Sequence, residues 1–300
     1  MNYFWTAILF IFGLAIGSFL NVVSLRYEPG QRLLDLKIIG GRSHCPHCRK
    51  TLRWYELIPL LSFIVQFGKC RDCGVRLSLQ YPLVEFLSGL IFVFVPLPLS
   101  SLMINDQRLM IVFPIIWIIV FLLFLLLSII DFRHYIIPDS INLSLAILGV
   151  ILIILLIIGN QGLMINGQSS FLGHYSLLFD LPFFSILNTQ YLILVFHFFA
   201  AIIAMAFFAA IIIFTKGRAM GWGDFKLVGA LGLIFGWPDV LMVVFLSFVI
   251  GAICVTPLLI KKQKTMKDAV PFGPFLIISS ALTFFFGYNI IDEYFRLFGL

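Results

Sequence analysis

Long apolar runs separated by short polar segments are the main pattern of this chain. A run of about 18 or more apolar residues is typical of a membrane helix, which crosses the hydrocarbon layer and satisfies its own backbone hydrogen bonds. We therefore predict an all-α polytopic membrane protein with about eight transmembrane helices, the sixth of them short. The predicted spans are residues 3–25, 83–99, 111–130, 141–158, 191–214, 225–237, 240–260 and 272–291.

One segment, residues 26–82, is polar enough and long enough to fold in water. It divides the prediction into three parts. Residues 1–25 form a first transmembrane helix, residues 26–82 a small cytoplasmic zinc-ribbon-like loop domain, and residues 83–300 a seven-helix membrane core. The composition agrees, because a chain that is 61% hydrophobic and 11% charged is unlike a soluble globular domain.

The basic residues predict the orientation of the spans, because cytoplasmic loops carry an excess of Lys and Arg. With the N-terminus outside, 18 of the 20 Lys and Arg residues fall in cytoplasmic pieces. The first basic residue, Arg26, follows the first apolar run, which favours a retained span over a signal peptide. The net charge of +6 then reflects topology, and we expect a lipid bilayer as partner and no nucleic acid. The outside loop, residues 159–190, is expected to lie on the membrane surface.

Two Cys-x-x-Cys knuckles lie in the predicted cytoplasmic loop, separated by 21 residues. Their cysteines are Cys45, Cys48, Cys70 and Cys73. Two residues between thiolates allow both sulfurs to bind one tetrahedral ion, and zinc is the default metal for four cysteines. A small polar segment needs such a support to fold, so we interpret the zinc as structural. A disulfide framework is the alternative, and the reducing cytoplasm argues against it.

Two carboxylates, Asp131 and Asp224, stand at the ends of apolar runs, where a charge is costly unless it is used. Two spans separate them, and an even number of spans returns the chain to the same membrane face. The pair suits an aspartic protease, in which one carboxyl group stays protonated while the other accepts a proton from water. Alternatively, Asp224 is the N-cap of the sixth helix and Asp131 faces lipid headgroups.

Two further charged residues flank these positions. Asp139 follows Ile137-Pro138, and capping of the fourth span explains it. Lys226 stands two residues after Asp224. It either sets the charge state of the pair, contacts substrate or extends to the interface.

Several separate stretches together resemble the type IV prepilin leader peptidase family, which combines prepilin peptidase and N-methyltransferase activities in a GxGD-type membrane aspartic protease. They keep the order of the family's motifs across nearly the whole chain. The matching stretches are GSFLNVV at 17–23, CPHC at 45–48, ELIPL at 56–60, CRDC at 70–73, YPLVE at 81–85, Asp131 with IPD at 137–139, GWGDFKL at 221–227 and PFGPF at 271–275.

The resemblance implies an enzyme of the bacterial inner membrane with its active site facing the cytoplasm. Such an enzyme cleaves the short basic leader from type IV prepilins and pseudopilins after a Gly, and N-methylates the new N-terminal residue with S-adenosylmethionine. It further implies that Asp131 and Asp224 are catalytic and that the four cysteines bind zinc. No glycine-rich nucleotide fingerprint marks residues that bind the methyl donor. Two alternatives remain open: a protease-only member with a structural zinc loop, and a proton-coupled transporter with a zinc docking module.

Overall fold

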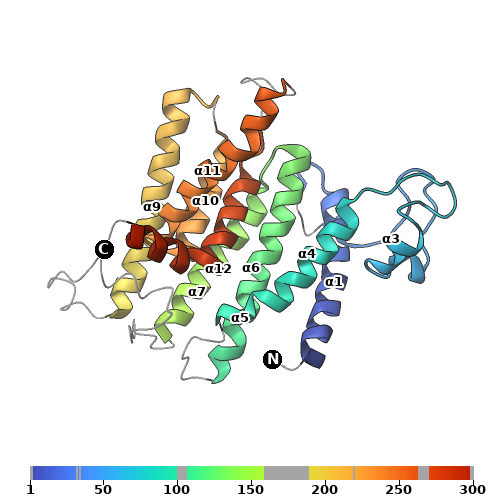
Figure 1. The fold of residues 1–300 in the computed structure, drawn as a ribbon, viewed down its shortest axis with the longest axis horizontal. Helices are drawn as coiled ribbons and strands as arrows, with labels where there is room; N and C mark the ends of the chain where they lie inside the picture. The colour runs from blue at the N-terminus through green and yellow to red at the C-terminus, as the bar shows by residue number, and fades with distance from the viewer. Residues whose placement is uncertain are drawn as a thin grey trace. The chain divides into compact units, whose positions relative to one another are not determined.

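The structure, a computed structural model of the chain, describes residues 3–31, 33, 35–99, 107–158, 189–218, 220–262 and 270–297 (Figure 1). The described part is helical and contains no strand, only two isolated β-bridges. This confirms the predicted fold class. Most of the predicted outside loop, residues 159–188, lies outside the described residues.

The helices follow the predicted apolar runs closely. Their bounds are α1 Tyr3–Arg26, α2 Leu36–Ile39, η1 Trp54–Leu57, α3 Leu61–Val65, α4 Gln80–Phe94, α5 Pro96–Leu99, α6 Gln107–His134, α7 Asp139–Ile158, α9 Thr189–Thr215, α10 Trp222–Phe235, α11 Asp239–Ile260 and α12 Gly273–Leu297.

The predicted count of eight spans is not confirmed. Within the described residues, six helices are long and apolar enough to cross a membrane: Tyr3–Arg26, Gln80–Leu99, Leu109–His134, Asp139–Ile158, Ile193–Thr215 and Asp239–Ile260. The other two predicted spans are helical. Helix α10 has 14 residues, or about 21 Å at 1.5 Å per residue, and the apolar stretch of α12 that the structure describes, Gly273–Gly287, has fewer than the 18 residues of a full span.

Contacts divide the chain into two units, and α6 contributes residues to both. The first unit comprises Met1–Ser101 and Trp117–Ile130, and the second comprises Leu102–Ile116 and Asp131–Leu300. In the first unit, α1 and α4 approach closely at small residues. A Cβ on Gly17 would lie 2.7 Å from the Cα of Glu85, so only glycine allows this crossing.

In the second unit, α10 packs against α7 and α9, while α11 packs against α12. The side chains of Leu227, Val228 and Leu231 on α10 are completely buried. The contact with α9 is backbone to backbone, because a Cβ on Gly232 would lie 2.4 Å from the Cα of Ala201. The short α10 is therefore a core helix of this unit, and its first turn is firmly placed.

Candidate active site and metal centre

Asp131 lies in the last turn of α6, and its side chain is only 3% exposed. Its Oδ2 accepts a hydrogen bond from the backbone N–H of Gly273 at 3.1 Å. Gly273 is the first residue of α12, where free N–H groups and the helix dipole favour a negative charge. A Cβ at position 273 would lie 2.6 Å from the same oxygen, so the hydrogen bond depends on glycine.

Asp224 lies in the first turn of α10 and is buried. The alternative that Asp224 is the N-cap is wrong, because the helix begins two residues earlier and Gly221 occupies the cap. The Oδ2 atom of Asp224 instead accepts a hydrogen bond from the N–H of Gly221 at 3.3 Å. Each carboxylate is thus held by one backbone N–H group at a helix N-terminus.

The side chain of Ile137 joins the surroundings of the two carboxylates. A Cβ on Gly223 would lie 3.1 Å from the Cβ of Ile137, and a Cβ on Gly273 would lie 3.3 Å from its Cδ1. The residues next to both carboxylates therefore pack on one isoleucine. Two carboxyl groups that lie close together in a buried site resist double ionisation, which is the property that an aspartic protease pair uses.

Polar contacts at the ends of α7 and α10 hold the two helices in register. Lys226 Nζ donates a hydrogen bond to Asp139 Oδ1 at 2.8 Å. Asp139 is the first residue of α7 and forms an ion pair, which the interpretation as a cap did not anticipate. Asn142 Nδ2 donates to the carbonyl oxygen of Gly223 at 3.4 Å. These contacts fix the backbone of the segment that carries Asp224.

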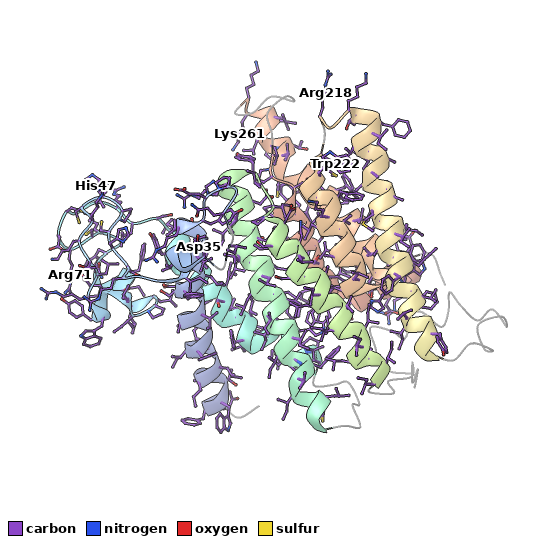
Figure 2. The ribbon with its side chains drawn as sticks, turned by 180° about the vertical axis from the view of Figure 1, so that it is seen from behind. Asp35, His47, Arg71, Arg218, Trp222 and Lys261 are labelled. Carbon is purple, nitrogen blue, oxygen red and sulfur yellow. The ribbon has the colours of Figure 1, made fainter. Side chains whose placement is uncertain are left out.

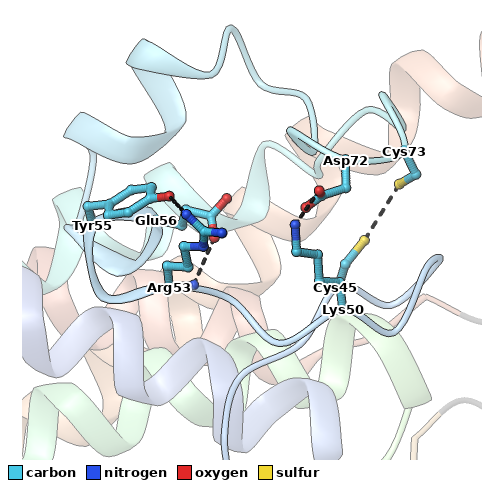
Figure 3. Close-up of polar contacts among 7 residues, drawn as sticks. All are labelled: Cys45, Lys50, Arg53, Tyr55, Glu56, Asp72 and Cys73. Carbon is cyan, nitrogen blue, oxygen red and sulfur yellow. Dashed lines mark hydrogen bonds and ion pairs between the residues drawn. The ribbon is translucent and has the colours of Figure 1, made fainter.

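The four predicted metal ligands come together in the first unit. The sulfur atoms of Cys45, Cys48, Cys70 and Cys73 all lie within 4.8 Å of one another, and the cysteines are free of disulfides. The Cys45 and Cys73 sulfurs are 3.9 Å apart (Figure 3). Zinc–sulfur bonds of about 2.3 Å in a tetrahedron place the sulfurs about 3.8 Å apart, so the cluster fits zinc.

Matching turns build the two knuckles of this cysteine module, which we define as residues 43–77. In each knuckle the N–H of the first cysteine bonds the carbonyl five residues later, Cys45 to Lys50 and Cys70 to Val75, both at 2.9 Å. An isolated antiparallel β-bridge closes each turn, joining the residue before it to the residue after it, His44 to Thr51 and Lys69 to Arg76. The module is therefore made of two similar loops that face each other across the sulfurs.

The pKa values of two thiols in the module shift in opposite directions, and burial with hydrogen bonds to the neighbouring cysteines raises that of Cys73 to about 11. Backbone N–H groups of Cys73 and Asp72 lower the pKa of the Cys70 thiol to about 7, which favours the thiolate that a metal needs. Lys50 forms an ion pair with Asp72 and so links the two knuckles (Figure 3). The hydrogen bond to Asp72 raises the pKa of Lys50 and keeps it charged. His47 is exposed on the module surface (Figure 2) and is not part of the cluster.

The backbone N–H of Gly273 is the feature of the candidate active site that sequence reasoning missed. The stretch PFGPF at 271–275 was identified in the sequence, but no hydrogen-bond partner was predicted for Asp131. The Pro-Phe-Gly-Pro run is the signal that could have suggested it, because it predicts a helix that begins beside Gly273. The sequence assigned no residues to the binding of the methyl donor.

Comparison with known proteins matches two families along the chain. Residues 11–98 match the bacterial peptidase A24 N-terminal domain, and residues 117–256 match the type IV leader peptidase family. No solved structure gives a significant match.

Curated relatives named prepilin leader peptidase/N-methyltransferase match nearly the full length of the chain. The protein of Bacillus subtilis (strain 168) is 30% identical over 299 residues, covering 97% of this chain and 98% of the relative. That of Aeromonas hydrophila is 30% identical over 313 residues, covering 98% and 95%. That of Legionella pneumophila is 29% identical over 314 residues, covering 98% and 96%.

Proposed function

Because this chain belongs to the type IV leader peptidase family, we propose that Asp131 and Asp224 are the catalytic pair of an aspartic peptidase that also methylates. The enzyme removes the leader from type IV prepilins and N-methylates the residue that cleavage exposes. The observation that carries the assignment of the pair is that two buried carboxylates, 93 positions apart in the sequence, have neighbours packed on Ile137.

Cleavage needs only the pair and a water molecule. The ionised carboxylate takes a proton from water as the hydroxyl adds to the peptide carbonyl carbon, while the protonated carboxyl group donates its proton to the carbonyl oxygen. The intermediate collapses when the C–N bond breaks and the amine receives a proton. The N–H groups of Gly273 and Gly221 stabilise the negative charge that moves between the two side chains.

The cysteine module has a structural part in this proposal. Four cysteines fill every position of a tetrahedral zinc site and leave no ligand position open for catalysis. When bound, zinc supplies the folding energy that a segment of this size lacks. The family resemblance associates methyl transfer with this loop, and S-adenosylmethionine supplies the methyl group. We assign no side chain to its binding.

The protein is a multi-pass protein of the inner membrane. We place its N-terminus outside and its carboxylate pair at the cytoplasmic face, on the basis of the 18 basic residues in the predicted cytoplasmic pieces. We retain the division into a first span at 1–25, a zinc loop at 26–82 and a peptidase core at 83–300. Pseudopilins, which share the leader and apolar helix of prepilins, complete the proposed set of substrates.

One assay tests both activities. Purified enzyme is incubated with a prepilin and labelled S-adenosylmethionine, and mass spectrometry reads the product. We expect a shortened pilin that carries the mass of one added CH₂ group. A shortened product without that added mass would leave a peptidase with a structural zinc loop, and an uncut pilin would remove the peptidase assignment. The family membership gives no support to the transporter alternative.

A further inference from the structure

Apolar side chains are exposed along one segment of the cysteine module, residues 54–67, which we call the interfacial segment. It contains η1 and α3. Trp54 is 77% exposed and Phe67 is 89% exposed. Large apolar side chains between them are also exposed, namely Leu57, Ile58, Leu61, Ile64 and Val65. So many exposed large apolar side chains within 14 residues point to a contact with another apolar phase.

One hydrogen bond fixes the depth of this segment relative to a membrane helix. The N–H of Leu60 donates to Oε2 of Glu85 at 2.8 Å. Glu85 is the sixth residue of the candidate span Gln80–Leu99, so it lies about 7 Å along the helix from its first residue. The start of α3 therefore lies beside the body of α4, below the level at which that helix begins.

The hydrogen bond between Leu60 and Glu85, which we call the anchor, lies in a buried and closely packed place. Glu85 is only 7% exposed, and its neighbourhood is formed by the close crossing with Gly17 of α1. Leu60 has a φ of 59°, in the left-handed region that a leucine rarely adopts. A strained residue held by a buried carboxylate argues that the position of the segment is specified and not incidental.

The charges around the segment match an anionic surface. Four basic residues of the same module are exposed: Arg53, Lys69, Arg76 and Arg71, the last of which is labelled in Figure 2. The guanidinium of Arg71 lies 5.2 Å from the centre of the Tyr55 ring. Aromatic and aliphatic side chains beside Lys and Arg are the composition of segments that lie in the membrane interface. Basic side chains there are attracted to anionic headgroups.

We propose that the interfacial segment inserts its apolar side chains into the bilayer at the level where α4 enters it, with the basic residues of the module on anionic headgroups. Lipid is favoured over a protein partner because the Leu60–Glu85 hydrogen bond places the segment at the depth of a membrane span. On α4 itself, Leu83 and Phe86 next to Glu85 also expose large apolar side chains. The bilayer thereby holds the zinc module against the first two spans.

Photocrosslinking tests the contact directly. p-Benzoylphenylalanine is placed at Ile64 or Phe67 of the full-length enzyme, and at exposed His47 of the same module as the control. The proteins are reconstituted in vesicles that contain phosphatidylglycerol and irradiated, once without substrate and once with added prepilin. We expect lipid adducts at positions 64 and 67 several-fold above those at position 47. Equal yields at all three positions, or adducts at 64 and 67 only with added prepilin, would overturn the proposal; the second result would identify a substrate surface.

The anchor supplies a second test that does not depend on catalysis. In Glu85→Gln the side chain keeps an oxygen that accepts from Leu60, whereas Glu85→Ala removes it. Lipid adducts at position 64 should persist in Glu85→Gln and fall several-fold in Glu85→Ala, with zinc content as the check that the module remains folded. Unchanged adducts in Glu85→Ala would show that the carboxylate does not set the depth of the segment. Vesicles of phosphatidylcholine alone should lower the yield, because the headgroup attraction is lost.

Discussion

The cysteine module and the carboxylate pair are assembled in opposite ways. In the module the interacting sulfurs of Cys45 and Cys73 are 28 residues apart, and short-range turns bring them together. In the carboxylate site, Asp131 and its donor Gly273 are 142 residues apart, and only the packing of helices brings them together. The first site is held by local chemistry and the second by the whole second unit. Damage to one should therefore leave much of the other intact.

Removing one cysteine should destabilise the protein more than the other substitutions that we propose. Structural zinc sites contribute about 10–16 kcal/mol of apparent binding free energy, and the module would lose it. We expect Cys45→Ser to lose its zinc and unfold the cysteine module. Leader cleavage should fall much less, since the carboxylate pair belongs to the other unit. Metal analysis of the purified protein measures this.

The control for that experiment is Cys254→Ser, because Cys254 lies in α11 outside the cluster. It should keep its zinc. Wild-type protein purified without bound metal, or a Cys45→Ser variant that keeps its zinc, would contradict the metal assignment.

A methyl group added at position 273 tests the carboxylate site. In Gly273→Ala the new Cβ would lie 2.6 Å from Oδ2 of Asp131, so the carboxylate or α12 must move. We expect leader cleavage to slow by about 10²-fold, as for other small displacements of catalytic groups, while zinc content stays unchanged. The measurement is the rate of prepilin cleavage.

Gly251→Ala is the matched control, because there the nearest atom to the new Cβ is a ring carbon of Phe275 at 3.3 Å. It should cleave at close to the wild-type rate. If Gly273→Ala cleaves as fast as Gly251→Ala, the close approach of α12 to Asp131 has no role in catalysis.

Removal of the ion pair between Lys226 and Asp139 should change the cleavage rate least. Both side chains are largely exposed, and exposed pairs contribute little. We expect Lys226→Met to change the cleavage rate by at most about fivefold. Rates of Lys226→Met, Asp139→Asn and the double variant form the cycle that measures their coupling. A loss as large as that of Gly273→Ala would show that Lys226 takes part in the chemistry.

The sequence predicted the local features well and the long-range ones incompletely. Apolar runs located every long helix, and the spacing of the cysteines located the cluster, because both signals are contained in short stretches. The predicted span count is not confirmed at α10, which is short and whose apolar residues are buried against α7 and α9. In the sequence, a buried apolar helix resembles a membrane segment. The partner of Asp131 was missed, because the Pro-Phe-Gly-Pro run predicts where a helix begins but not that its first N–H meets a residue 142 positions away.

The most direct test of the central claim is the rate of leader cleavage under single-turnover conditions by Asp131→Asn, Asp224→Asn and the double variant. Asp292→Asn on α12 is the control, because its carboxylate is paired on the surface with Arg296. Groups that act as one unit are not additive, so each single variant should lose about 10³-fold or more and the double variant no more than either. A single variant that retains cleavage within about tenfold of wild type would contradict the account.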